Sequence, residues 1–171
     1  MSEILSGLTA QLRPRVLSLV YEEKYGFEKN GKSAELGGEA DRELLLFLRN
    51  WADQLVTTAT TAEAEEYKQP TRPLILLSRR KHAAGWLDAT RLRFEDRMLE
   101  EILKGKKTVF ETGLTASREL FEQGLIDQIL IHHDITQFKT ELLGMDVSLS
   151  TRVGYHKRHI SLFERRGNRL K

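Results

Sequence analysis

The segment VFETGLTASRELFEQGLIDQILIHH, Val109 to His133, constrains the fold more than any other part of the chain. It begins with a short apolar run, followed by a turn at a glycine and a stretch whose apolar residues have helical spacing. After a second turn at Gly124 it ends in an isoleucine-rich run. This order predicts a strand, a helix and a second strand, which is the repeating unit of a parallel α/β sheet. Ligands of such sheets bind where a strand passes into the next helix. The turn at Glu111 and Gly113 is therefore the first candidate site.

The same alternation extends along the chain. Apolar runs predict strands over Arg13–Tyr21, at the start of Asp53–Tyr67, over Pro73–Ser78 and near the end at His156–Arg166, with a weaker strand pattern at Met145–Leu149. Helical spacing begins at Glu39, with Leu44, Leu48 and Trp51 in one stripe, and recurs over Phe94–Lys104. Residues 79–93 follow no clear pattern.

These patterns predict an α/β fold with a mostly parallel central sheet flanked by helices. With 171 residues, the chain fits a single domain over 1–171, with an amphipathic lead-in over 1–12 and a basic tail over 165–171.

Composition narrows the functional classes. The chain has no cysteine, so disulfides and thiolate chemistry are excluded, and a reducing cytoplasm is the expected compartment. It has no apolar run long enough to cross a membrane and no signal-peptide pattern, so we expect no membrane association. The net charge of +2 gives no reason to expect a nucleic-acid partner, although seven basic residues and one acid lie between Arg152 and Lys171. His132 and His133 are adjacent in a strand and point to opposite faces, so no metal site is expected.

Three motifs lie in a specific order. They are NGKSAELGGEADRELLLFLRNWAD at 30–53, TTATTAEAEEY at 57–67 and ETGLTASRELFEQGLIDQ at 111–128, with RPLILLSRR between the second and the third. In these motifs the chain resembles the riboflavin-pathway pyrimidine reductases, a family that includes the C-terminal domain of the bifunctional deaminase-reductases. The resemblance implies a dihydrofolate-reductase-like fold, NADPH as cofactor, a ribosylamino-pyrimidine phosphate or similar small molecule as substrate, and a homodimer.

The resemblance also implies site residues. In the family the third motif approaches the cofactor phosphates, the second carries a retained threonine, and the S-R pair lies near the adenosine 2′-phosphate. Glycine there lets backbone come close, and helix N–H groups point at the anion. The implied cofactor-binding residues are Thr61, Ser78, Arg79, Glu111, Thr112, Gly113 and Thr115, and the implied substrate-binding residue is Glu65. Thr115 is expected to cap the helix; no catalytic proton donor is identified.

The chain departs from the family pattern in its cofactor loops. Thr58 and Thr60 stand at two glycine positions, and Glu63 stands where the family usually has arginine. Tyr25 replaces the aspartate of a D-G turn. The segment from 80 to 107 is shorter than in the family and has room for about one helix and one short strand. A further strand-helix unit beside the adenine is therefore expected to be missing, and the exposed sheet edge is expected to be covered by a second subunit.

Two alternatives therefore stay open. The chain is either a reductase or a catalytically silent relative that acts as a binding or interaction protein. At the residue level, Glu111, Gly113 and Thr115 either contact cofactor or only form a turn and cap. Ser78 and Arg79 either hold a phosphate or form an exposed basic turn.

Overall fold

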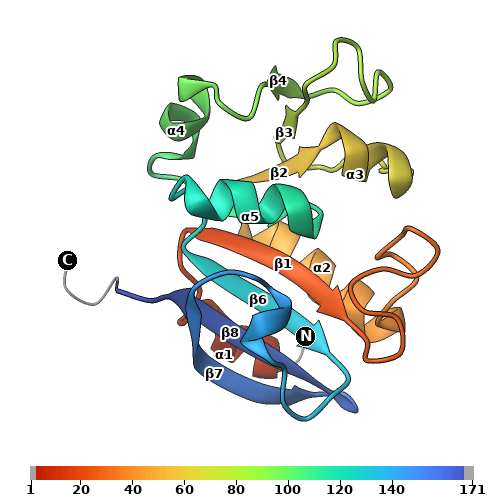
Figure 1. The fold of residues 1–171 in the computed structure, drawn as a ribbon, viewed down its shortest axis with the longest axis vertical. Coiled ribbons are helices and arrows are strands. Elements are labelled where there is room, and N and C mark those ends of the chain that lie inside the picture. Colours follow the sequence, from red (N-terminus) through yellow and green to blue (C-terminus); the bar gives the residue numbers. More distant parts are fainter. Residues whose placement is uncertain (1–2, 168–171) are drawn as a thin grey trace.

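The computed structural model describes residues 3–167 and shows an α/β fold built on one eight-stranded sheet (Figure 1). The strand order is β4-β3-β2-β5-β1-β6-β8-β7. Neighbours from β4 to β6 are parallel, and β8 and β7 are antiparallel to the strands beside them. The strands are β1 Arg15–Tyr21, β2 Gln54–Thr58, β3 Leu74–Leu77, β4 Thr90–Leu92, β5 Thr108–Glu111, β6 Gln128–His133, β7 Val147–Tyr155 and β8 Arg158–Arg165.

Helices cover both faces of the sheet. They are α1 Glu3–Thr9, α2 Gly38–Trp51, α3 Ala59–Ala64, α4 Arg97–Leu103 and α5 Leu114–Glu122, with a short 3-10 helix at Thr140–Leu142. In Figure 1, α5 lies in front of the sheet, and α1 and α2 lie behind it. The two apolar clusters agree: one contains residues of α1, α2 and α3, and the other contains residues of α4 and α5. The expected mostly parallel sheet flanked by helices is confirmed.

The inner parallel strands β1, β2, β3, β5 and β6 are largely buried on both faces, which explains their continuous apolar sequences. Adjacent residues of β1 show the alternation: Val16 packs with the cluster behind the sheet and Leu17 with the cluster in front. The lead-in is part of this core, because Leu5 and Leu8 of α1 are almost fully buried. None of the helices within residues 3–167 combines the length and apolar character that crossing a bilayer requires.

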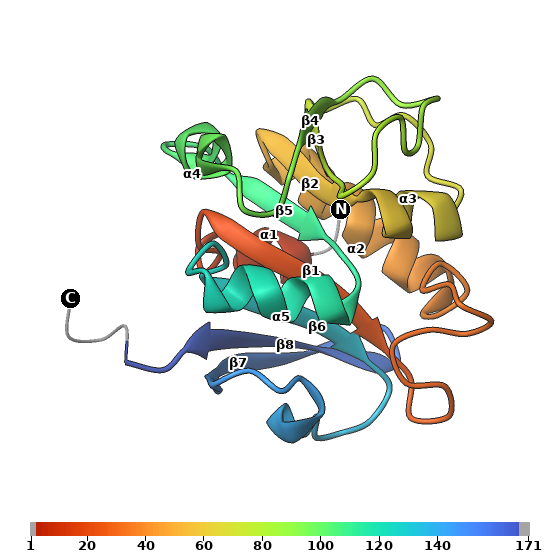
Figure 2. The ribbon, with the colours of Figure 1, turned by 45° about the horizontal axis from the view of Figure 1, so that its top comes forward.

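Between residues 80 and 107 the chain forms one short strand, β4, and one helix, α4 (Figure 2). Two sequence expectations need correction. Helix α4 begins at Arg97 and not at Phe94, because the side chain of Asp96 accepts a 2.9 Å hydrogen bond from the amide of Met98 and caps the helix. Strand β7 is nine residues long, well beyond the expected Met145–Leu149. Its pattern is weak because it is an outer strand with an exposed middle.

The basic C-terminal region is used largely within the molecule. Arg165 donates to the carbonyls of Phe121 and Ile126, and its guanidinium stacks on the Phe121 ring. Arg152 donates to Ser161 Oγ. The end of the predicted tail, 168–171, lies outside the described residues.

Candidate functional site

The candidate site lies beyond the carboxyl ends of two neighbouring parallel strands of the sheet, β2 and β5. After β2 the chain turns into α3, which packs behind the sheet with α2; after β5 it turns into α5, which packs in front. When the helices that follow two adjacent parallel strands leave toward opposite faces, a crevice forms beyond the carboxyl ends of the strands, and this is where open α/β sheets bind ligands. The topology alone therefore selects this position.

A cavity of about 270 Å³ lies at this position. It is lined by the start of α3, the start of α5, the turn after β3 and one aromatic ring: Thr58, Thr60, Thr61, Arg79, Phe94, Gly113, Leu114, Thr115, Ala116 and Glu119. We call this cavity the crevice. It brings together Thr61, Arg79, Gly113 and Thr115, four of the residues expected to contact cofactor.

The two helix starts are hydrogen-bonded to each other across the crevice. The amide of Gly113 donates to Thr61 Oγ1 at 3.1 Å, and the amide of Thr61 donates to Thr58 Oγ1 at 3.1 Å. At the start of the nine-residue helix α5, the amides of Thr115 and Ala116 have no carbonyl within the helix to which they can donate. Such amides, together with the helix dipole, favour a bound anion.

Gly113 is not required by the fold itself. Its φ is −63° and its ψ is 160°, which any residue adopts, and a Cβ added there would meet only Thr61 Oγ1, at 3.6 Å. A glycine that neither conformation nor internal packing requires, on the floor of a crevice, fits a ligand that approaches the backbone closely. Gly113 also occupies the N-cap position of α5, so the expectation that Thr115 caps the helix is wrong. Thr115 lies one residue beyond the first helical position and is exposed in the crevice.

The side chains of Glu111 and Thr112 are used internally. Glu111 accepts two hydrogen bonds from Arg49, at 2.6 and 2.8 Å, and one from the hydroxyl of Tyr67 at 2.6 Å. Thr112 is 4% exposed, and its Oγ1 lies 2.7 Å from Ser117 Oγ. Neither residue lines the crevice, although both were expected to contact the cofactor.

The network of Arg49, Glu111 and Tyr67 carries strong electrostatic coupling. Burial raises the pKa of Tyr67 above its ordinary value, and the negative charge of Glu111 raises it further. Burial alone would lower the pKa of Arg49, but its hydrogen bonds to Glu111 and the charge of that carboxylate raise it overall. The network joins three parts of the chain to one another: the end of α2, the segment after α3 and the end of β5, which directly precedes the crevice.

The threonines at the family's glycine positions sit without backbone strain. Thr58 has a φ of −107° and caps α3. Their side chains nevertheless occupy space, because both Thr58 and Thr60 line the crevice.

The remaining expected residues lie around the crevice. Arg79 donates to both carboxylate oxygens of Glu119 at 2.9 Å and stacks over the ring of Phe94, 4.3 Å from its centroid. Ser78 Oγ accepts from the amide of Arg80 at 2.9 Å and shapes the turn. Ser78 does not line the crevice, whereas Arg79 lines it and already has a carboxylate partner in Glu119.

Two glutamates of the second motif also have internal partners. Glu65 accepts from the amide of Ser33 at 2.6 Å, from its hydroxyl at 2.8 Å and from the amide of Ala34 at 3.0 Å, so it holds the loop before α2. Glu63, which stands where the family has arginine, pairs with Arg80 at 2.7 Å.

Sequence reasoning missed several residues of this region. Phe94 and Glu119 line the crevice, and Lys81 and Arg93 line a second cavity beside it. The basic runs SRRKH and RLRF were a usable signal for the latter pair, but they fall in the segment whose secondary structure the pattern did not resolve.

The histidines of β6 lie on opposite faces as expected. His132 Nδ1 lies 3.0 Å from Asp41 of α2, whereas His133 Nε2 lies 2.7 Å from Ser161 of β8. Over residues 3–167 no group of three or more His, Asp or Glu side chains is arranged to hold a metal ion.

Comparisons with known proteins rest on structure. No protein-family model matches the sequence, and no curated protein matches it. A pyrimidine reductase-like protein from Corynebacterium diphtheriae superposes with a TM-score of 0.65 at 16% identity, over 95% of this chain and 97% of that one. Acinetobacter baumannii RibD gives 0.64 at 14% identity, over 88% of this chain and 58% of that one. Dihydrofolate reductase from Enterococcus faecalis, complexed with NADP(H) and RAB-propyl, gives 0.61 at 16% identity, over 88% and 95%.

The chain thus has the dihydrofolate-reductase-like fold, as the sequence resemblance implied. Its coverage of the Corynebacterium protein, at 97%, also shows that it is not shorter than that protein by a whole strand-helix unit.

Proposed function

We propose that the crevice binds NADPH and that the chain is an NADPH-dependent reductase of a ribosylamino-pyrimidine phosphate or a similar small substrate. The observation that carries this proposal is Gly113: it lies at the switch point between β2 and β5, on the floor of a cavity, and nothing in the fold requires a glycine there. The fold it shares with a reductase complexed with NADP(H) supports the choice of cofactor.

The chain's own groups fit a diphosphate. The amides of Thr115 and Ala116 would donate to its oxygens, and the bare backbone of Gly113 would let it lie close to the start of α5. Thr61 keeps the two helix starts at a fixed separation through its bond to the Gly113 amide. When bound, NADPH supplies the hydride that reduces the substrate, and the protein's part is binding and orientation.

The second candidate is a binding protein without catalysis. It is favoured by the side chains of Thr58 and Thr60, which take up part of the crevice, and by the ion pair that occupies Arg79. In that case the fold is kept and the cofactor path is closed. Homodimerisation and a small-molecule ligand are common to both candidates.

The two candidates separate in one experiment. NADPH should be titrated into the protein by calorimetry, and its oxidation should then be followed with a ribosylamino-pyrimidine phosphate. Saturable binding with turnover supports the reductase. The absence of NADPH binding to the folded protein favours the second candidate.

A further inference from the structure

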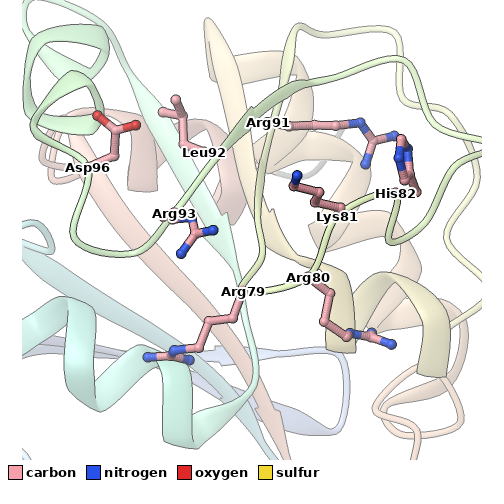
Figure 3. A pocket seen from close by; sticks show the side chains of 8 residues that line it. All are labelled: Arg79, Arg80, Lys81, His82, Arg91, Leu92, Arg93 and Asp96. Carbon is pink, nitrogen blue, oxygen red and sulfur yellow. The ribbon is translucent and has the colours of Figure 1, made fainter.

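Polar side chains interrupt the apolar front face of the sheet where β6, β8 and β7 lie side by side. The strand register brings four of them together, next to Gly154: His133, Arg152, His159 and Ser161. We call these four residues the polar cluster. It lies at the opposite edge of the sheet from the crevice and from the arginine-rich turn after β3 that Figure 3 shows. His133 and Ser161 are fully buried, and burying polar groups is costly unless each finds a partner.

A chain of hydrogen bonds fixes the direction of Arg152. The carbonyl of Ile135 accepts from Nδ1 of His133 at 2.7 Å, so Nε2 of this ring accepts from the hydroxyl of Ser161, also at 2.7 Å. Burial lowers the pKa of His133 to about 4, so Nε2 keeps its lone pair at neutral pH. The Ser161 oxygen in turn accepts from Nε of Arg152 at 2.8 Å. The guanidinium is therefore held by its inner nitrogen, with its two outer nitrogens directed away from Ser161.

Arg152 lacks a counter-charge. Over residues 3–167 no carboxylate pairs with it, and its hydrogen-bond partner is the neutral hydroxyl of Ser161. By contrast, Arg158 on the neighbouring strand, which is also half-buried, lies 3.6 Å from a carboxylate oxygen of Glu22. Charged groups that are withdrawn from water are ordinarily paired with an opposite charge. A half-buried guanidinium that is oriented but unpaired therefore fits an anion that comes from outside the described chain.

The surface next to Arg152 is open. Gly154 lies two residues further along β7, on the same face, and a Cβ added there would meet no atom within 4 Å. Its φ is not positive, so neither the backbone nor the packing requires glycine at this position. Opposite Gly154, the ring of His159 stacks on that of His133 with centroids 5.5 Å apart and stays partly exposed. A guanidinium and an imidazole thus border a bare stretch of strand.

We infer that the polar cluster binds a carboxylate, held by the two outer nitrogens of Arg152 and by the ring of His159, above the bare backbone of Gly154. Two parallel donors of a guanidinium match the two oxygens of a carboxylate in one plane. One full cation also matches the single charge of a carboxylate, whereas a phosphomonoester carries close to two. The source is a small organic acid, and an acidic side chain of a second copy of the chain would offer the same group. The site does not depend on the proposed function.

The test is an NMR titration with sodium acetate at constant ionic strength, followed through the ring signals of His159 and the amide signal of residue 154. The parent should show saturable shifts with a Kd on the order of 1 mM, which two charged hydrogen bonds can supply. Arg152→Lys keeps the charge but loses the paired donors, so it should weaken binding about tenfold.

Gly154→Val separates the site from the fold. It keeps every charge but fills the open space, so the acetate-dependent shifts of His159 should disappear. Thermal denaturation should show this variant to be at least as stable as the parent, because a β-branched residue favours a strand. Lys157→Met, which removes an exposed cation from the turn between β7 and β8, is the matched control for charge and should stay within about twofold of the parent.

Shifts in the parent that do not saturate, or that sodium chloride reproduces at the same concentration, would overturn the inference. An unchanged affinity in Gly154→Val, or an equal loss in Lys157→Met, would overturn it as well. Light scattering in the same solutions identifies the source of the carboxylate. If acetate binds and the mass of the parent does not change, the ligand is a small organic acid. If acetate and Arg152→Lys each lower the mass of a dimer to 19.7 kDa, the carboxylate belongs to a second copy of the chain.

Discussion

The amide nitrogen of Gly113 donates a 3.1 Å hydrogen bond to Oγ1 of Thr61, and this bond joins the first residues of α5 and α3. The two residues are 52 positions apart in sequence and meet only because β2 and β5 are neighbours in the sheet. The junction leaves the backbone of Gly113 facing the crevice.

Gly113→Ala should separate binding from stability. Alanine adopts the φ of −63° without strain, so the free energy of unfolding should stay the same or rise by up to about 1 kcal/mol. Its Cβ stands on the crevice floor, so NADPH affinity should fall about tenfold or more. Denaturant unfolding and calorimetry measure the two effects.

Gly124→Ala is the matched control for Gly113→Ala. Gly124 ends α5 with a φ of 78°, so alanine there should destabilise the protein by about 1 kcal/mol and leave NADPH affinity unchanged. Unchanged NADPH affinity in Gly113→Ala would remove the reason for placing a ligand on this backbone.

Glu111→Gln should destabilise the protein far more than Tyr67→Phe. The Glu111 side chain is 10% exposed and that of Arg49 is 23% exposed, so the variant leaves a largely buried guanidinium without its counter-charge, at a cost of about 3 kcal/mol. Tyr67→Phe removes one hydrogen bond to a charged group and should cost about 1.5 kcal/mol.

Arg79→Ala is the comparison for an exposed ion pair and should cost under about 1 kcal/mol. Urea unfolding curves measure all three variants. Equal midpoints for Glu111→Gln and Arg79→Ala would show that the buried network contributes no more than a surface pair.

This network shows how far the sequence could be interpreted. The strand over 108–111, the turn and α5 follow from apolar runs and glycines, because local periodicity reports burial. Alternation along β5 places Phe110 in front of the sheet and Glu111 behind it, away from the crevice. The partners of Glu111 lie 62 and 44 residues away, and no local pattern identifies such pairs. Strand β4 could not be located from the sequence, because only three residues form it and its first two are exposed.

The free energy of unfolding should decrease as the pH falls, because of the titration of His133. The carbonyl of Ile135 lies 2.7 Å from Nδ1 and can only accept, so the ring proton sits on Nδ1 and Nε2 accepts from the hydroxyl of Ser161. Burial lowers the pKa of His133 to about 4. The unfolded chain, with a pKa of about 6.5, takes up a proton that the folded protein excludes. The contribution is therefore complete above pH 6.5 and is lost as the pH falls to 4, by up to roughly 3 kcal/mol.

Urea unfolding of the parent and of His133→Gln between pH 7 and pH 4 tests this, since the variant should show a shallower decline. NMR titration of the imidazole gives the pKa directly. A ring that titrates near 6.5 would contradict the prediction.

The protein should form a homodimer. The outer edge of the sheet at β4 is three residues long, and β7 leaves a nine-residue edge at the other side, so each presents unpaired backbone groups. Light scattering at micromolar concentration should return twice the chain mass of 19.7 kDa. A mass of 19.7 kDa would show that the edges need no partner.

NADPH titration of the parent protein beside the double variant Thr58→Gly/Thr60→Gly tests the crevice most directly. If the crevice between Thr61 and Gly113 admits the cofactor, the parent binds NADPH saturably with one molecule per chain, and the double variant changes the affinity only slightly. Replacing the N-cap residue Thr58 by glycine should lower the stability of α3 only slightly. Replacing Thr60 by glycine, within the helix, should destabilise α3 by roughly 1 kcal/mol. No binding by the folded parent contradicts the account. Binding gained only in the double variant would show that the two threonines close the path, and binding by neither would show that the crevice is not a dinucleotide site.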